Sequence, residues 1–152
     1  MRLIGDVYRS VVVAAIAAAA LLAPGDVDAK DSPVVVGEVS TSVVRDGVDV
    51  PGVLRATVVE ELPTIDLSHA RKRPVILSVS LLRMDTEATS QGTATTCVIS
   101  AALRTKKGGD LFAILEGRAQ AQEGSDSGAR ERKAIRHAVR GALERIPEAL
   151  AQ

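Results

Sequence analysis

Asp66, Ser68 and His69 lie within four residues of each other and supply the three side-chain types of a hydrolase triad. In a triad the histidine takes the proton of the serine hydroxyl, and the carboxylate orients the histidine. Triad members usually come from separated segments, and Ser68 lacks the glycine-flanked turn that exposes a nucleophilic serine. We therefore interpret this segment as a solvated loop and not as a catalytic site.

Cys97 is the single cysteine and lies beside Val98 and Ile99. A reactive thiolate needs a partly exposed, electropositive setting, so we expect a buried and inert thiol that forms no intramolecular disulfide. The only histidines, His69 and His137, are 68 positions apart and have no third ligand at a recognisable spacing. This spacing argues against a zinc site.

Two basic segments suggest anion binding. Lys106 and Lys107 precede Gly108-Gly109, but a phosphate-cradling loop opens a helix, and these glycines join two extended segments, which favours a hairpin turn. Arg71-Lys72-Arg73 is a candidate docking patch for an anionic partner, although a solvated loop before a strand is the preferred interpretation.

Glu116 and Glu131 are the remaining candidates, as paired acids. No active-site motif distinguishes them from surface carboxylates, and the aromatic platforms expected in sugar-cleaving enzymes are missing. We therefore assign no catalytic, cofactor-binding or metal-ligating residue, expect no cofactor, and expect a protein that is not an enzyme.

The elements that must position these residues begin with a β-branched run at Val34–Thr41, which predicts a strand. Asp46-Gly47 is a turn pair. Asp49 and Pro51 are typical of a helix start, and apolar residues at four-residue spacing predict a helix of about three turns that stops at Pro63. Those apolar residues are Leu54, Val58 and Leu62.

Alternating apolar residues predict a half-buried strand over Val75–Met84. A polar loop is expected over Thr86–Thr93. The alternation resumes over Ala94–Leu103, and Leu111–Gln120 is again extended, so the glycine pair between them predicts a β-hairpin.

After a polar loop at Gln122–Gly128, helical spacing runs from Ala129 to Pro147, which ends or kinks the helix and leaves a short tail at Ala149–Gln152. The apolar stripe comprises Ile135, Ala138, Val139, Ala142, Leu143 and Ile146. Arg132, Lys133, Arg136 and Arg140 occupy the remaining faces and interleave with Glu131 and Glu144, as on an ordinary solvent face.

The order strand-helix-strand-strand-strand-helix predicts an α+β fold, a small, mostly antiparallel sheet with two helices packed on one face. Small residues recur on the hairpin and on the last helix, where they allow the two backbones to approach closely. These residues are Ala101, Ala113, Gly117 and Ala119 on the hairpin, and Ala138 and Ala142 on the helix.

Composition restricts the function further. The 152 residues are 46% hydrophobic, but the only aromatic residues are Tyr8 and Phe112. Without residues 1–29 the chain keeps 17 of its 19 basic and 16 of its 19 acidic residues. Nucleic-acid binding needs a basic stripe and usually aromatic stacking platforms, so we expect no nucleic-acid partner.

Residues 1–29 resemble a secretory signal peptide. Met1–Ser10 carries Arg2 and Arg9, and an apolar run of 13 residues follows from Val11 to Ala23. Val27 and Ala29 suit a cleavage site after Ala29. A membrane span needs about 20 apolar residues, so an uncleaved anchor or a buried helix is less favoured. We expect an exported periplasmic or extracellular protein, with residues 30–152 as one domain and no membrane span after cleavage.

The strand Cys97–Leu103, the turn Thr105–Asp110, the strand opening at Leu111-Phe112 and the closing helix Ala134–Leu150 resemble small bacterial envelope accessory domains. Similar domains occur in curli-secretion proteins and in the outer-membrane activators of penicillin-binding proteins. The resemblance implies an envelope accessory role and assigns no functional residue. Many such relatives are lipoproteins, whereas residues 20–30 contain no cysteine.

Three functions remain open. The leading hypothesis is a secreted, non-enzymatic accessory protein that binds another macromolecule through the uncovered sheet face or a sheet edge. The second is an enzyme whose site is built from scattered polar residues such as Asp66, His69 and Glu116. The third is a self-associating structural subunit that completes its thin aliphatic core with a second copy.

Overall fold

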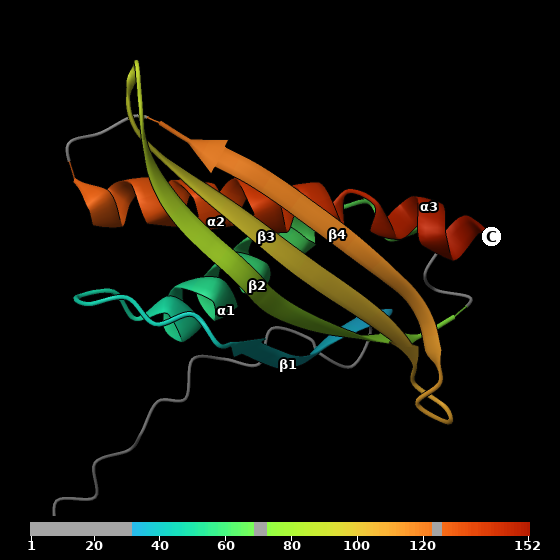
Figure 1. Cartoon of the computed structure of the whole chain (residues 1–152). Helices are drawn as coiled ribbons and strands as arrows, with labels where there is room; N and C mark the ends of the chain where they lie inside the picture. The colour runs from blue at the N-terminus through green and yellow to red at the C-terminus, as the bar shows by residue number, and fades with distance from the viewer. Residues whose placement is uncertain (1–31, 69–72, 123–125) are drawn as a thin grey trace, which may run out of the picture.

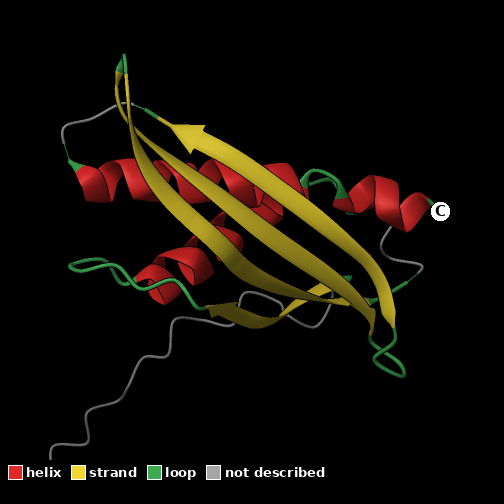
Figure 2. Cartoon of the chain, in the orientation of Figure 1, coloured by secondary structure: helices red, strands yellow, loops and turns green. Residues whose placement is uncertain are grey.

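The computed structural model describes residues 32–68, 73–122 and 126–152. Four strands form one sheet in the order β1-β2-β3-β4, and Figures 1 and 2 show the helices on one side of it. The predicted α+β fold, with a mostly antiparallel sheet and helices on one face, is confirmed. The elements are β1 (Val34–Thr41), α1 (Val50–Glu61), the short 3-10 helix η1 (Leu62–Thr64), β2 (Val75–Thr89), β3 (Gly92–Thr105), β4 (Leu111–Ala121), α2 (Ser127–Leu143) and α3 (Ile146–Ala151).

Helix α1 connects β1 and β2, which pair in parallel. Its start is the predicted one, because the Asp49 carboxylate accepts a hydrogen bond from the Gly52 amide at 3.1 Å. Such a cap satisfies one of the backbone donors that a helix leaves unpaired at its first turn. The α-helix ends just before Pro63, which lies in η1.

The core lies between the helices and one face of the sheet. Residues at alternate positions of β2 and β3 are buried beneath α1 and α2, as the period-two pattern predicts. The largest fully buried side chains are Leu54, Leu77, Leu81, Ile99, Leu103, Ile135, Leu143 and Ile146. The interior of the described residues is therefore aliphatic.

The loop predicted over Thr86–Thr93 is wrong. Strand β2 continues to Thr89, β3 begins at Gly92, and only Ser90 and Gln91 form the turn. Threonine is β-branched and suits a strand despite its hydroxyl, and polar residues tolerate extended structure where both faces meet water. Polarity alone was therefore a poor signal for a loop here.

The predicted tail after Pro147 is also wrong. Pro147 does interrupt the helix, since α2 ends at Leu143, but residues 146–151 form the separate helix α3. Proline occupies the first turn of that helix, where its missing amide hydrogen removes no intrahelical bond. Ile146 and Leu150 are buried, so the C-terminal segment is part of the core.

The predicted signal peptide, residues 1–29, lies outside the described residues. Cleavage after Ala29 and the domain limits 30–152 therefore stay predictions. Among the helices in residues 32–68, 73–122 and 126–152, none is both long and apolar enough to cross a membrane.

Candidate binding surface

The face of the sheet that no described helix covers, here called the open face, is built by strand alternation. Successive side chains of a strand point to opposite faces of the sheet. In β2, β3 and β4 one set is buried beneath the helices, and the alternating set points to the open face. The strand register aligns them in rows, such as Ser78 beside Ala102 beside Ile114. The open face comprises Ile76, Ser78, Ser80, Leu82, Arg83, Asp85 and Glu87 of β2, Thr96, Val98, Ser100, Ala102 and Arg104 of β3, and Ile114, Glu116, Arg118 and Gln120 of β4.

The middle of the open face carries short side chains. Ser80 lies beside Ser100, and the adjacent row pairs Ser78 with Ala102. The hydroxyl groups of Ser40 and Ser80 lie 2.9 Å apart, which extends this polar band onto β1. Because these side chains are short, a flat partner surface can approach the sheet closely here.

A bulge adds a large apolar group to this face. The pairing of β2 with β3 shifts between Leu81 and Arg83, while Leu81 and Met84 both point into the core. Leu82 and Arg83 therefore both lie on the open side, and the Leu82 side chain is 54% exposed. Bulges of this kind re-aim side chains and occur often near functional surfaces.

One end of the open face is charged and forms a cleft of about 320 Å³. Arg83 and Asp85 form an ion pair within it. Glu87 and Arg118 also line the cleft, so its lining carries two positive and two negative side chains. Such a site complements a surface that presents both signs of charge, and it does not resemble a binding site for a polyanion.

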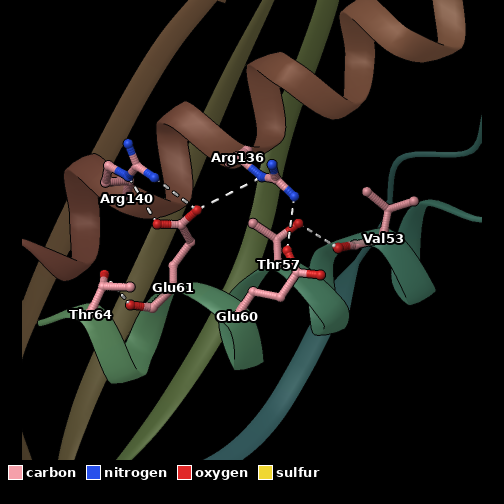
Figure 3. A network of polar contacts seen from close by, with 7 residues as sticks. All are labelled: Val53, Thr57, Glu60, Glu61, Thr64, Arg136 and Arg140. Atoms are coloured by element: carbon pink, nitrogen blue, oxygen red, sulfur yellow. Dashed lines mark hydrogen bonds and ion pairs between the residues drawn. The ribbon is translucent and has the colours of Figure 1, made fainter.

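On the side of the sheet opposite the open face, helices α1 and α2 are joined to each other by polar contacts (Figure 3). Arg140 of α2 donates to both carboxylate oxygens of Glu61 of α1, at 2.9 and 3.1 Å. The hydrogen bond to Glu61 raises the pKa of the Arg140 guanidinium. The Glu61 side chain is only 6% exposed, so this bidentate pair fixes the helices at their contact.

Arg145, between α2 and α3, reaches the outer edge of the sheet. Its guanidinium donates a hydrogen bond to the carbonyl oxygen of Glu116 in β4 at 3.2 Å. An edge strand exposes unpaired backbone groups that invite another strand, and a charged side chain on them discourages such pairing. The open face is therefore a better candidate surface than the β4 edge.

Of the three triad candidates, Asp66 and Ser68 lie in the part of the chain that the structure describes. The Asp66 carboxylate accepts a hydrogen bond from the Ser68 amide at 3.0 Å, an arrangement typical of a local turn. His69 lies outside the described residues, as do Arg71 and Lys72. The remaining residue of that basic segment, Arg73, lies over the Phe112 ring at 5.7 Å.

Cys97 is fully buried on the core side of β3. Burial raises the pKa of its thiol to about 12, and the charge of Glu131 adds to this shift. The expectation of a buried thiol is confirmed, and such a thiol is a poor nucleophile at neutral pH.

Gly108 and Gly109 have φ angles of 91° and 71° and form the predicted hairpin turn between β3 and β4. Glu116 is exposed on the open face, whereas Glu131 is buried on α2 beneath the sheet. These two glutamates therefore do not form an acid pair. Within the described ranges, no group of three or more histidine, cysteine, aspartate or glutamate residues is placed to hold a metal ion.

The sequence did not reveal a buried polar cluster at the start of α2. Arg130 and Glu131 are each 7% exposed, which corrects the expectation that Glu131 lies on a solvent face. The Arg130 guanidinium donates to the Thr95 hydroxyl at 3.2 Å. The Arg45 guanidinium lies 3.7 Å from the Glu131 carboxylate and also donates to the Met84 carbonyl oxygen. Glu131 lies four residues before Ile135, and Arg130 lies four residues before the buried Ala134, so helical spacing was the available signal.

No protein-family model matches the chain, and no curated protein matches its sequence. Solved structures match its fold. A hypothetical protein from Chlamydia trachomatis matches with a TM-score of 0.57 at 10% identity, over 78% of this chain and 97% of that one. A protein from Xanthomonas campestris of the family DUF330 matches with a TM-score of 0.50 at 15% identity, over 74% and 79% of the two chains. The PelC dodecamer from Paraburkholderia phytofirmans matches with a TM-score of 0.45 at 11% identity, over 71% and 85%.

At these identities the first two similarities show a shared fold. They agree with the predicted α+β fold, and the likeness to small bacterial envelope accessory domains as a class stays a prediction. The narrower likeness to curli-secretion proteins and to activators of penicillin-binding proteins stays a prediction.

Proposed function

We propose that the protein is an exported, non-enzymatic accessory protein that binds a folded protein partner through its open face. The observation that carries this proposal is the band of short side chains around Ser78, Ser100 and Ala102, which no described helix covers. Exposed Leu82 and Ile114 flank this band. A flat, polar surface with a few exposed aliphatic groups is typical of a transient protein interface.

The charges of the open face favour a protein over an anionic polymer. The middle of the face lacks cationic side chains among the described residues, and the charged end pairs Arg83 and Arg118 with Asp85 and Glu87. A polyanion would leave the two carboxylates without counterions, whereas a protein surface can offer both signs of charge. The apolar run Val11–Ala23 supports export to the compartment where this partner would be found.

Site-specific photocrosslinking in the native cells tests the proposal. A photoreactive benzophenone amino acid replaces Ile114 on the open face or, as the matched control, Val59 on α1. The two aliphatic side chains are similarly exposed, at 63% and 57%, but lie on opposite sides of the sheet. We expect a discrete protein adduct from position 114, no adduct from position 59, and loss of the first adduct in the additional variant Ser100→Arg.

Adducts of equal yield from both positions, or none from position 114, would overturn the proposal. An adduct between two copies of this chain would replace it with self-association. Cell fractionation checks the export step separately, since we expect the exported fraction to hold a chain that begins at Lys30 by mass spectrometry. A chain that keeps residues 1–29 in the cytoplasm would contradict export.

A further inference from the structure

A second concave surface lies between α1 and α2, on the side of the sheet opposite the open face. It is a groove of about 540 Å³. Val53 and Ala56 of α1 and Ala129 of α2 contribute to its apolar lining. Glu60 and Thr57 of α1, and Arg132, Lys133, Arg136 and His137 of α2, supply its polar lining.

The charge of the groove is positive. Arg132, Lys133 and Arg136 face a single acidic lining residue, Glu60. The Arg136 guanidinium donates to the Glu60 carboxylate at 2.8 Å, and one of its nitrogens lies 3.8 Å from the Glu61 carboxylate. The Arg132 guanidinium lies 3.8 Å from the carboxylate of Asp126, a residue outside the groove lining. These arginines are about half exposed, so their ion pairs are weak and can exchange for a ligand carboxylate.

The groove is also held in shape. The bidentate contact of Arg140 with Glu61 lies next to it, and Thr57 within it donates to the Val53 carbonyl at 2.8 Å (Figure 3). A groove whose walls are already fixed loses little conformational entropy when a ligand binds.

We propose that this groove binds an acidic peptide segment, with glutamate or aspartate side chains on Arg132, Lys133 and Arg136 and small apolar side chains against Val53, Ala56 and Ala129. Apart from Ala129 in the first turn of α2, the lining residues lie in helix interiors, where the amides are already bonded, so the groove offers no cradle of several backbone donors for an isolated phosphate. Inorganic phosphate would also leave the apolar part unfilled. This site is independent of the open face, and both can be occupied at once.

Fluorescence polarisation with the protein isolated from its native cells tests the proposal. The probe is a fluorescein-labelled peptide of alternating glutamate and alanine, and its glutamine-alanine counterpart is the uncharged control. We expect the glutamate peptide to bind and the glutamine peptide to bind much more weakly. Raising the salt from 0.1 M to 1 M shortens the Debye length from about 10 Å to about 3 Å and should weaken the binding strongly.

Matched charge insertions locate the site. Ala56→Glu places a carboxylate in the groove, whereas Val59→Glu places the same charge at an exposed position of the same helix outside the lining. We expect Ala56→Glu to weaken peptide binding more than about ten-fold and Val59→Glu to change it little. Lys133→Gln should weaken binding roughly three- to five-fold, and Lys106→Gln, on the distant β3–β4 turn, should leave it unchanged.

Equal affinity for the two peptides, or equal weakening by Ala56→Glu and Val59→Glu, would overturn the proposal. Polyphosphate that binds more tightly than the glutamate peptide, with the same dependence on Ala56→Glu, would replace the peptide with a phosphate polymer as the ligand. Circular dichroism of each variant verifies that it is folded. The outcome does not depend on crosslinking at Ile114, so either proposal can fail without the other.

Discussion

Gly117 of β4 lies directly against the backbone of Ala138 in α2. A Cβ atom at Gly117 would lie 2.0 Å from the Ala138 carbonyl oxygen and 2.9 Å from the Ala142 nitrogen. Both distances are far below van der Waals contact, so only glycine allows the strand and the helix to pack at this separation. The small-residue pairing of the hairpin with the last helix is confirmed at this point, and Ile114 points away to solvent.

Gly117→Ala is expected to destabilise the fold by about 1–3 kcal/mol, because the new methyl group overlaps with backbone that has to move. Gly141→Ala is the matched control. Gly141 lies in α2 with no atom within 4 Å of its would-be Cβ, so the same substitution should stabilise by about 0.5–1 kcal/mol through helix propensity. Urea unfolding followed by circular dichroism measures both, and changes of the same sign would contradict the packing argument.

The free energy of unfolding is expected to depend on pH through the buried thiol of Cys97. The folded thiol has its pKa raised from 9.0 to about 12 by burial, with a smaller contribution from Glu131. The unfolded chain therefore loses its thiol proton first as the pH rises. The stabilisation is fully present below pH 9 and is lost between pH 9 and about 12, at a limiting slope of roughly 1.4 kcal/mol per pH unit.

Unfolding free energies measured from pH 8 upwards, for the wild type and Cys97→Ala, isolate this slope as the difference between the two curves. Parallel curves would show that the folded thiol titrates normally. A colorimetric thiol reagent provides a second measurement, since Cys97 should react only after unfolding, whereas an added Ser90→Cys in the exposed β2–β3 turn should react at once.

Glu61 and Glu60 are neighbours in α1 with different surroundings. Glu61 is buried and accepts two hydrogen bonds from Arg140, whereas the exposed Glu60 pairs with the half-exposed Arg136. Glu61→Ala is expected to destabilise by about 1–2 kcal/mol, since it removes charge-assisted hydrogen bonds at the helix contact. Glu60→Ala should change stability by less than about 0.5 kcal/mol. Thermal unfolding of the two variants tests this difference, and equal effects would be inconsistent with it.

Asp49 caps α1 through its bond to the Gly52 amide. Asp49→Ala is expected to destabilise by about 1 kcal/mol, because the amide loses its acceptor. Asp49→Asn keeps an acceptor oxygen and should remain close to the wild type. Urea unfolding measures both variants, and an equal loss in the two would point to the aspartate charge instead of the cap.

Local patterns in the sequence determined most of the secondary structure. β-branched residues predicted β1 at its observed bounds, Val34–Thr41, and the Asp49 cap and the Gly108-Gly109 turn were also predicted. These features depend on residues a few positions apart, whose conformational preferences act within one turn or one strand. The loop predicted over Thr86–Thr93 failed because the β-branched threonines suit a ladder as well as a loop.

Only the tertiary structure decided which surfaces are buried, joined or free. Arg140 and Glu61 are separated by 79 positions, and nothing in either local sequence indicates the other. Arg130 and Glu131 are polar, yet both are buried against the sheet. The open face and the α1–α2 groove exist because both helices pack on the same side of one sheet, and that choice depends on long-range burial of apolar area. Local sequence patterns do not determine on which side of the sheet each helix packs.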